Sequence, residues 1–147
     1  MKKIGQYSAR GQFLEGTVET LSLFDGRFDT AYKVINFVIW AGDISSSSND
    51  VAAKLSTTNL GGMPSSGDMM NAADNREIAW AAVQAGTAAF NNPASIIDTD
   101  NLIVEDLFVT GQSGGSSIPI NYMITMEKYD ITEWQGALAM VRNKSQG

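Results

Sequence analysis

Apolar and polar residues alternate most regularly near the C-terminal end of the chain, over residues 118–126. This period of two is typical of a β-strand that buries one face and exposes the other. Pro119 stands at the start of the segment, where a strand tolerates the loss of one backbone donor. The segment therefore predicts a core strand whose inward side chains are Ile118, Ile120, Tyr122, Ile124 and Met126.

A helical period follows this strand directly and extends to residue 144. Asp130 or Thr132 can cap the helix at its start, and Arg142 and Lys144 suit the negative end of its dipole. Gly136 indicates close packing against the sheet, because glycine is otherwise unfavourable in a helix interior. The spacing i, i+3, i+4, i+7 predicts one buried apolar stripe, formed by Trp134, Ala137, Leu138 and Val141.

Residues 13–24 and 27–40 predict a β-hairpin. The first segment is rich in Thr, Val and Leu, and a bulge near Thr20 would bring its apolar residues onto one face. Asp25 and Gly26 lie between the segments and suit a type I′ turn. The second segment is apolar on both faces, which predicts a strand in the middle of a sheet or at an interface. Its faces are Ile35, Phe37 and Ile39 on one side and Tyr32, Val34, Val38 and Trp40 on the other.

Residues 74–86 fit two structures. Asp74 and Glu77 match a helical capping box, Gly86 matches a C-terminal cap, and the alanine content also favours a helix. Ile78 and Trp80 instead alternate with small residues, as they would in a strand. The helix is the preferred interpretation, and the strand is the alternative.

The composition changes over residues 42–71, which are rich in Ser, Gly and Asn and have few apolar anchors. This predicts a long inserted loop, and loops of this length are uncommon in compact domains unless they are functional. Methionine is adaptable and common at contact surfaces. The segment is therefore either a mobile loop or an interaction arm. The candidate interaction residues are Met63, Met69 and Met70, with Trp40 as a further candidate.

Residues 102–110 complete the pattern as a strand, followed by a flexible hairpin loop over residues 111–117, and residues 91–93 mark a turn. Together the segments predict one mainly β domain over residues 1–147. Its fold is an antiparallel β-sandwich or an open β-barrel with one C-terminal helix, and a second short helix if residues 74–86 are helical.

The chain contains no cysteine and no histidine. This excludes disulfides, thiolate metal sites, most zinc sites and catalysis by Ser-His-Asp or Cys-His groups. Glu15 and Glu19 fit solvated strand positions better than a glycosidase pair. The densest acidic group lacks the glycine and terminal glutamate of a calcium loop, so a charged turn explains it more simply. That group is Asp98, Asp100, Glu105 and Asp106. We expect no enzyme, and we assign no catalytic, cofactor-binding or metal-binding residue.

The net charge of −6 is unevenly distributed along the chain. Residues 34–127 carry two basic and ten acidic groups, whereas the segments before and after are each net +1. The acidic body argues against nucleic acid as a main partner. This uneven distribution of charge suits head-to-tail contacts between neighbouring copies. The simpler alternative is that the charged residues are scattered over a solvated surface without a role. No apolar stretch approaches the ~20 residues of a membrane span.

These general features resemble those of small structural proteins of phage and viral particles, such as coat, decoration or tail-tube subunits. The features are the lack of Cys and His, the β-rich core, the long Ser/Gly/Met loop and the strand–helix ending EKYDITEWQGALAMVRNKSQG. The resemblance implies a self-assembling subunit located in the virion, whose partners are other copies and other virion proteins. The alternative is a monomeric or small-oligomer β-barrel module that binds a carbohydrate or an apolar ligand.

Overall fold

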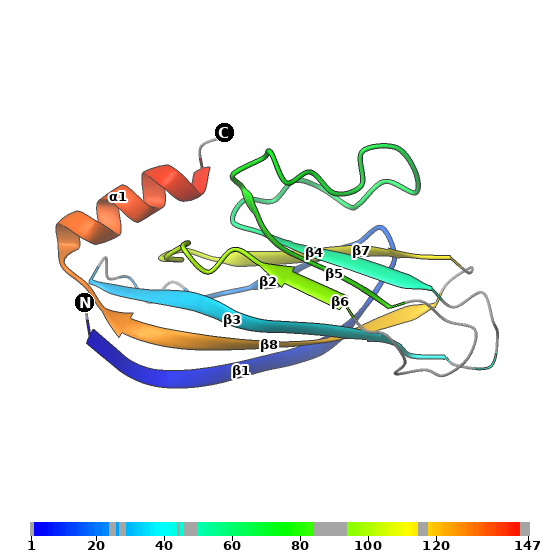
Figure 1. The fold of residues 1–147 in the computed structure, drawn as a ribbon, viewed down its shortest axis with the longest axis horizontal. Coiled ribbons are helices and arrows are strands. Elements are labelled where there is room, and N and C mark those ends of the chain that lie inside the picture. The colour runs from blue at the N-terminus through cyan, green and yellow to red at the C-terminus, as the bar shows by residue number, and fades with distance from the viewer. Residues whose placement is uncertain are drawn as a thin grey trace.

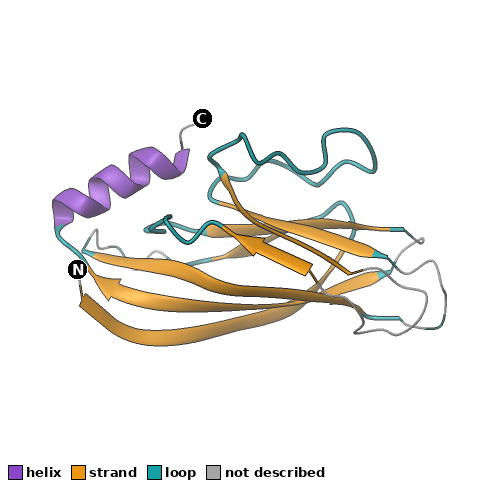
Figure 2. Ribbon diagram, viewed as in Figure 1, coloured by secondary structure: helices purple, strands orange, loops and turns teal. Residues whose placement is uncertain are grey.

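Two antiparallel β-sheets pack face to face, and one helix lies beside them at the C-terminal end (Figures 1 and 2). This computed structural model describes residues 2–23, 26, 29–43, 45, 50–83, 94–114 and 118–144, and it leaves out the side chains of Ala94, Glu133 and Trp134. The predicted mainly β fold with a C-terminal helix is confirmed, and its form is that of a β-sandwich.

The first sheet has three long strands in the order β1-β8-β3. Strand β1 spans Lys2–Leu14, β8 spans Pro119–Asp130 and β3 spans Thr30–Ala41. Since β8 lies in the centre, its inner face packs on the core from Ile120 to Met126. The alternation predicted for residues 118–126 is confirmed, because all five inward side chains are buried.

The second sheet has five strands in the order β2-β7-β4-β5-β6. They are β2 (Val18–Leu21), β7 (Leu107–Ser113), β4 (Val51–Ser56), β5 (Glu77–Val83) and β6 (Ala94–Ile97). Strand β4 occupies the centre of this sheet, although the sequence predicts a loop there. The short segment VAAKLS carries a lysine in its middle, and this charge obscures an otherwise buried strand.

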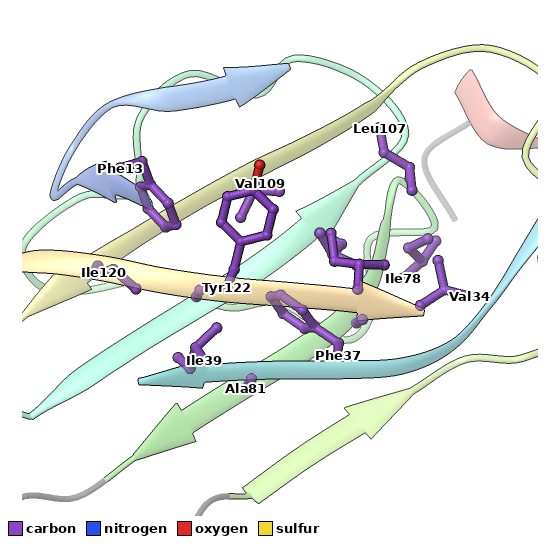
Figure 3. Packing of buried hydrophobic residues seen from close by; sticks show 14 of the residues in the cluster. Phe13, Val34, Phe37, Ile39, Ile78, Ala81, Leu107, Val109, Ile120 and Tyr122 are labelled. Atoms are coloured by element: carbon purple, nitrogen blue, oxygen red, sulfur yellow. The ribbon is translucent and has the colours of Figure 1, made fainter. Parts of the chain in front are cut away.

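The core fills the space between the two sheets (Figure 3). Phe37 and Ile39 of β3 and Ile120 of β8 project from one sheet, and Val109 of β7 and Ala81 of β5 project from the other. All five are buried. Small residues on the second sheet leave room for the larger side chains of the first, which is how close-packed interiors interdigitate.

The predicted strand over residues 13–24 is divided between the two sheets. Gly16 adopts a φ of 74°, a left-handed conformation that glycine accepts readily, and the chain turns there. Strand β2 then pairs with β7, and β3 pairs with β8. The predicted bulge near Thr20 and the predicted hairpin are therefore wrong. Of the predicted turn, Asp25 lies outside the described residues, and Gly26 has a φ of 86°.

Strand β3 lies at the edge of its sheet, not in the middle. A bulge between Val34 and Asn36 changes which side chains share a face. Val34 consequently joins Phe37 in the core, whereas Ile35 is 36% exposed. The predicted grouping of Ile35 with Phe37 and Ile39 is wrong because periodicity alone does not show a bulge.

Residues 77–83 form a strand, so the preferred helix over residues 74–86 is wrong. Glu77 does not cap a helix; its carboxylate binds Lys54 on the neighbouring strand β4. This cross-strand ion pair favours the sheet over the helix that the local propensities indicate. The predicted cap at Gly86 and the predicted turn at residues 91–93 lie outside the described residues.

The predicted strand over residues 102–110 becomes regular only at Leu107. Before it, Ile103 makes an isolated bridge to Tyr32 of β3. Ile103, Leu107 and Val109 are all buried, and so is Val104. Because β7 and β8 belong to different sheets, the connection between them is not a hairpin loop. Its residues 115–117 are not described.

Helix α1 spans Glu133–Lys144. Thr132 caps it: the Thr132 hydroxyl accepts from the Gln135 amide, and the Gln135 side chain accepts from the Thr132 amide. The helix buries Gly136, Ala139 and Asn143. The close packing against the sheet inferred at Gly136 stays a prediction. The predicted buried stripe is wrong, since Ala137, Leu138 and Val141 are exposed. The side chain of Trp134 is not described.

Candidate functional site

A long segment between β4 and β5 covers the outer face of the five-stranded sheet (Figure 1). We call residues 57–76 the cover segment. Met63 fixes it to the sheet: its amide donates to Thr110 Oγ1 at 2.8 Å, and its carbonyl accepts from Gln112 Nε2 at 2.7 Å. The Met63 side chain is only 2% exposed. Met63 is therefore an anchor of the cover segment, and its buried side chain leaves little surface for the interaction role predicted from the sequence.

The cover segment also touches the turn that joins β1 to β2. A Cβ atom added to Gly62 would lie 1.9 Å from the carbonyl oxygen of Gly16, so the two backbones approach too closely for any side chain. Gly16 in turn donates its amide to the Gly111 carbonyl of β7 at 3.0 Å. The cover segment thus packs against the turn that connects the two sheets. Position 62 requires glycine, because a side chain there would collide with the backbone of Gly16.

A buried ion pair lies beneath the cover segment. Lys54 Nζ is 3.0 Å from Glu77 Oε2, and both side chains are almost fully buried. The other carboxylate oxygen of Glu77 accepts from the Asn71 amide and from Trp80 Nε1, each at 2.9 Å. Every charged atom of this pair has a partner, as buried charges require. The arrangement holds the cover segment in place.

A second ion pair closes the end of the cover segment. Arg76 Nη2 lies 2.7 Å from Asp74 Oδ2, and Arg76 Nε also donates to the same carboxylate. The side-chain hydrogen bond from Arg76 holds the pKa of Asp74 below its ordinary value. Asp74 therefore stays ionised through mildly acidic conditions, which keeps this turn intact.

A cavity of about 340 Å³ opens between the cover segment and the ends of the strands beneath it. Its floor is formed by small side chains of β4 and β5, Ala52 and Ala82, and Met69 of the cover segment forms part of its wall. Gln112 and Ser113 add polar groups. Of the three methionines proposed as contact residues, Met69 is thus the one that lines a cavity, and Met70 is partly exposed.

The structure does not bring Trp40 together with the methionines. Trp40 lies on β3 opposite Asn121 of β8, and Asn121 accepts from Gln12 of β1 at 2.9 Å. Since the neighbouring residues Ile39 and Ile120 are buried, Trp40 belongs to the outer face of the three-stranded sheet, where it is partly exposed. The four predicted interaction residues therefore lie in two separate parts of the structure, with Met63 buried beneath one of them.

The acidic residues considered for calcium do not converge. Asp98 accepts from the Asp100 amide and the Asn101 side chain, whereas Glu105 pairs with Lys144 at 2.9 Å. Asp106 accepts from the Leu23 amide. In the part of the chain that the structure describes, no three acidic side chains gather as metal ligands. These carboxylates stabilise turns and the helix terminus.

Strand β1 leaves one edge of the three-stranded sheet open, because its neighbour among the described strands is β8 alone. The strand is 13 residues long, and Ile4 and Tyr7 are 47% and 50% exposed. This strand is missing from the elements predicted above. Its sequence nevertheless has a pattern of small residues, Gly5, Ala9 and Gly11, that alternate with polar ones. The small residues serve packing, because a Cβ at Gly11 would lie 2.8 Å from the Tyr122 hydroxyl.

Basic residues bracket the open edge of β1. Lys2 and Arg10 are exposed, and Lys3 pairs with Glu127 on β8. The hydrogen bond from Lys3, together with one from Tyr129, lowers the pKa of Glu127. Between these charges the stretch from Ile4 to Ala9 is uncharged, so it presents its free backbone groups without a protecting charge in the middle.

Comparison with known protein families found no match, and comparison with curated proteins found none either. Within the described residues no helix has the length and apolar character needed to cross a membrane. Two features of the described residues bear on function: the open edge of β1 and the cavity under the cover segment.

Proposed function

We propose that the protein is a structural, self-assembling subunit of a virion, and that the open edge of β1 is its main assembly contact. The observation that carries this proposal is the exposed, uncharged stretch from Ile4 to Ala9 on a long edge strand. Proteins that stay monomeric protect such edges with charges, bulges or covering loops. Strand β1 has one irregularity, between Lys3 and Gly5, and pairs regularly from Gly5 onward. The resemblance of the chain to coat, decoration and tail subunits supports placing the assembly in a virion.

The charges on β1 favour a neighbour other than β1 itself. If two β1 strands paired antiparallel around the uncharged stretch, the basic end of one copy, Lys2 and Lys3, would lie near Arg10 of the other. Like charges that face each other across a strand pair destabilise it. The strand therefore pairs with a different edge of the next copy, and such head-to-tail contacts build rings or open lattices. The acidic middle of the chain supplies surfaces of opposite charge.

Charging the edge of β1 is expected to abolish assembly. In the variant Ile4→Lys/Ser8→Lys, both substitutions fall on exposed positions, so folding is retained, but the added cations oppose pairing with a neighbouring strand. Size-exclusion chromatography with light scattering at high protein concentration measures the result. We expect assemblies from the parent protein and monomers from the variant.

The control for this variant carries the same added charge on the cover segment, as Pro64→Lys/Ser66→Lys, since both positions are exposed. It is expected to assemble like the parent protein. A parent protein that remains a strict monomer at high concentration would overturn the proposed function, and so would equal assembly of the two lysine variants.

The cavity under the cover segment favours a second candidate function, the binding of an apolar ligand. Its volume of about 340 Å³ is at the lower end of the range for small-molecule sites, and its walls combine apolar side chains with a few polar groups. Met69 supplies an adaptable wall that can follow the shape of a ligand. This observation supports the alternative of a binding module.

Filling the cavity separates the two functions. Ala82→Leu introduces a larger side chain on the cavity floor, and Ser66→Leu places the same residue at an exposed position that does not line the cavity. Titration with an anilinonaphthalene dye reports binding by fluorescence. If the cavity binds apolar ligands, Ala82→Leu lowers the dye affinity at least fivefold while Ser66→Leu leaves it unchanged. Equal affinities for both variants would refute the second function.

A further inference from the structure

Lys128 stands on the central strand β8, one strand in from the open edge of β1. Its direct neighbour on β1 is Gly5, and its direct neighbour on β3 is Tyr32. Tyr7 of β1 lies opposite Met126, which is buried in the core. Because successive side chains of a strand point to opposite faces, all these residues share the core-facing side of the sheet. They continue that side past Met126, the last buried residue of β8.

The ammonium group of Lys128 lies between two tyrosine rings. Lys128 Nζ is 5.9 Å from the centroid of the Tyr7 ring and 5.6 Å from that of the Tyr32 ring, and the two rings meet edge to face. Such contacts orient a cation, but they do not neutralise its charge. The cations that form ion pairs within the described residues are Lys3, Lys54, Arg76 and Lys144. Lys128 is thus an oriented cation without a carboxylate partner in the described part of the chain.

Gly5 makes this cation accessible from the edge of the sheet. The glycine places no side chain between Lys128 and the edge, and the Tyr7 ring lies across it: a Cβ at Gly5 would be 3.1 Å from Tyr7 Cε2 and 3.4 Å from the Tyr7 hydroxyl. Tyr7 is 50% exposed, and Lys128 is partly exposed. A strand paired with β1 would lie about 4.8 Å from it. An acidic side chain opposite Gly5 on that strand could therefore reach both the Tyr7 hydroxyl and the Lys128 ammonium.

We infer that Gly5, Tyr7 and Lys128 form a subsite for a carboxylate, and that the strand of the next copy that pairs with β1 carries an aspartate or glutamate opposite Gly5. This inference rests on the proposed function, because it names the chemistry of the partner at the β1 contact. Pairing at this edge removes water from Lys128, and a cation that loses water without gaining an anion is costly. A carboxylate offsets this cost through charge-assisted hydrogen bonds. The subsite thereby selects the strand that pairs with β1.

The charge distribution of the chain agrees with a carboxylate from another part of the next copy. Strand β1 contains three basic residues and no acidic one, so a second β1 strand cannot fill the subsite. Residues 34–127 carry ten acidic and two basic groups. Both of those basic groups, Lys54 and Arg76, are already paired within the subunit. The carboxylate therefore comes from a different segment of the neighbour, as a head-to-tail contact requires.

Removing the charge of Lys128 tests the subsite. Lys128→Met keeps an apolar chain against the two tyrosine rings but leaves the carboxylate of the partner without a cation. The matched control is Lys33→Met, because Lys33 Nζ lies 5.6 Å over the Tyr129 ring on the other face of the same sheet. Light scattering of a dilution series measures the concentration at which half of the protein is assembled. We expect this concentration to rise at least tenfold for Lys128→Met and less than twofold for Lys33→Met.

Cross-linking identifies the carboxylate itself. A carbodiimide joins an amine to a carboxylate that it contacts, and assemblies of mixed ordinary and isotope-labelled copies distinguish links between copies from links within one. Mass spectrometry of the digested assemblies is expected to find Lys128 joined to an aspartate or glutamate of another copy. Lys128→Arg serves as the control, because it retains the cation but has no amine. It is expected to assemble and to lose this link.

Two results would overturn the subsite. One is equal assembly of Lys128→Met and Lys33→Met, with both variants folded by circular dichroism. The other is an assembled parent protein in which Lys128 forms no link between copies. If Ile4→Lys/Ser8→Lys is monomeric in the same experiments, the β1 contact survives either result and only the subsite falls. A parent protein that never assembles would instead refute the proposed function.

Discussion

Lys54→Met is expected to lower the free energy of unfolding by about 3–5 kcal/mol, because it leaves the Glu77 carboxylate buried without its cation. The methionine matches the length of the lysine chain, so the loss arises from the charge and not from a cavity. Chemical denaturation followed by circular dichroism measures the change. Glu77 also holds the Asn71 amide and Trp80 Nε1, so the cover segment is expected to loosen with it.

The double variant Lys54→Met/Glu77→Gln distinguishes an uncompensated charge from lost packing. Glutamine retains an acceptor for the Asn71 amide and for Trp80 Nε1 but carries no charge. We therefore expect the double variant to recover more than half of the stability that Lys54→Met loses. A double variant as unstable as the single one would contradict the interpretation that burial of an unpaired charge is the cause.

Met63→Ala is expected to destabilise the protein by about 2–5 kcal/mol, the range for truncating a fully buried methionine. The same truncation at Met70, which is partly exposed, serves as the matched control and is expected to change stability by less than about 1 kcal/mol. Thermal or urea denaturation gives both values. Equal effects of the two substitutions would show that Met63 does not anchor the cover segment.

The contrast between Met63 and Met70 shows where sequence reasoning reaches its limit. Both residues stand in a Ser- and Gly-rich segment with no periodicity, so no local pattern distinguishes a buried methionine from an exposed one. The difference arises from Thr110 and Gln112, which lie far away in the sequence and bind the backbone of Met63. Long-range polar contacts of this kind leave no trace in local composition.

The elements with uninterrupted periodicity are the ones that the sequence predicts correctly. Strand β8 alternates without a break, and its buried residues follow directly from the pattern. Strands β3 and β4 depart from the prediction because a bulge after Val34 shifts one pattern and a buried lysine, Lys54, interrupts the other. For Lys54 the partner, Glu77, is 23 residues away, so local propensity cannot anticipate the strand.

The candidate site shows the same limit. The periodicity of α1 identifies Ala137, Leu138 and Val141 as one stripe, and the structure keeps them on one face. Periodicity does not show whether that face points toward the body of the protein or toward solvent, because a buried stripe and an exposed stripe have the same spacing. The body of the protein binds Asn143 instead: the Leu102 carbonyl accepts from the Asn143 side chain, and the Thr57 hydroxyl donates to the Asn143 carbonyl. These two hydrogen bonds select the outward orientation of the stripe.

The pairing of β1 with β8 also determines when the protein can fold on the ribosome. Lys2 lies opposite Asp130, so β1 can pair only after the chain up to the end of β8 has been synthesised. Until β8 emerges, β1 has two open edges, and nascent chains on neighbouring ribosomes can pair through them. Refolding is expected to be slow for the same reason, since contacts between distant segments dominate the sheet. The three-stranded sheet therefore forms only once β8 has emerged, and the five-stranded sheet, whose strands all precede β8 in the chain, can pair earlier.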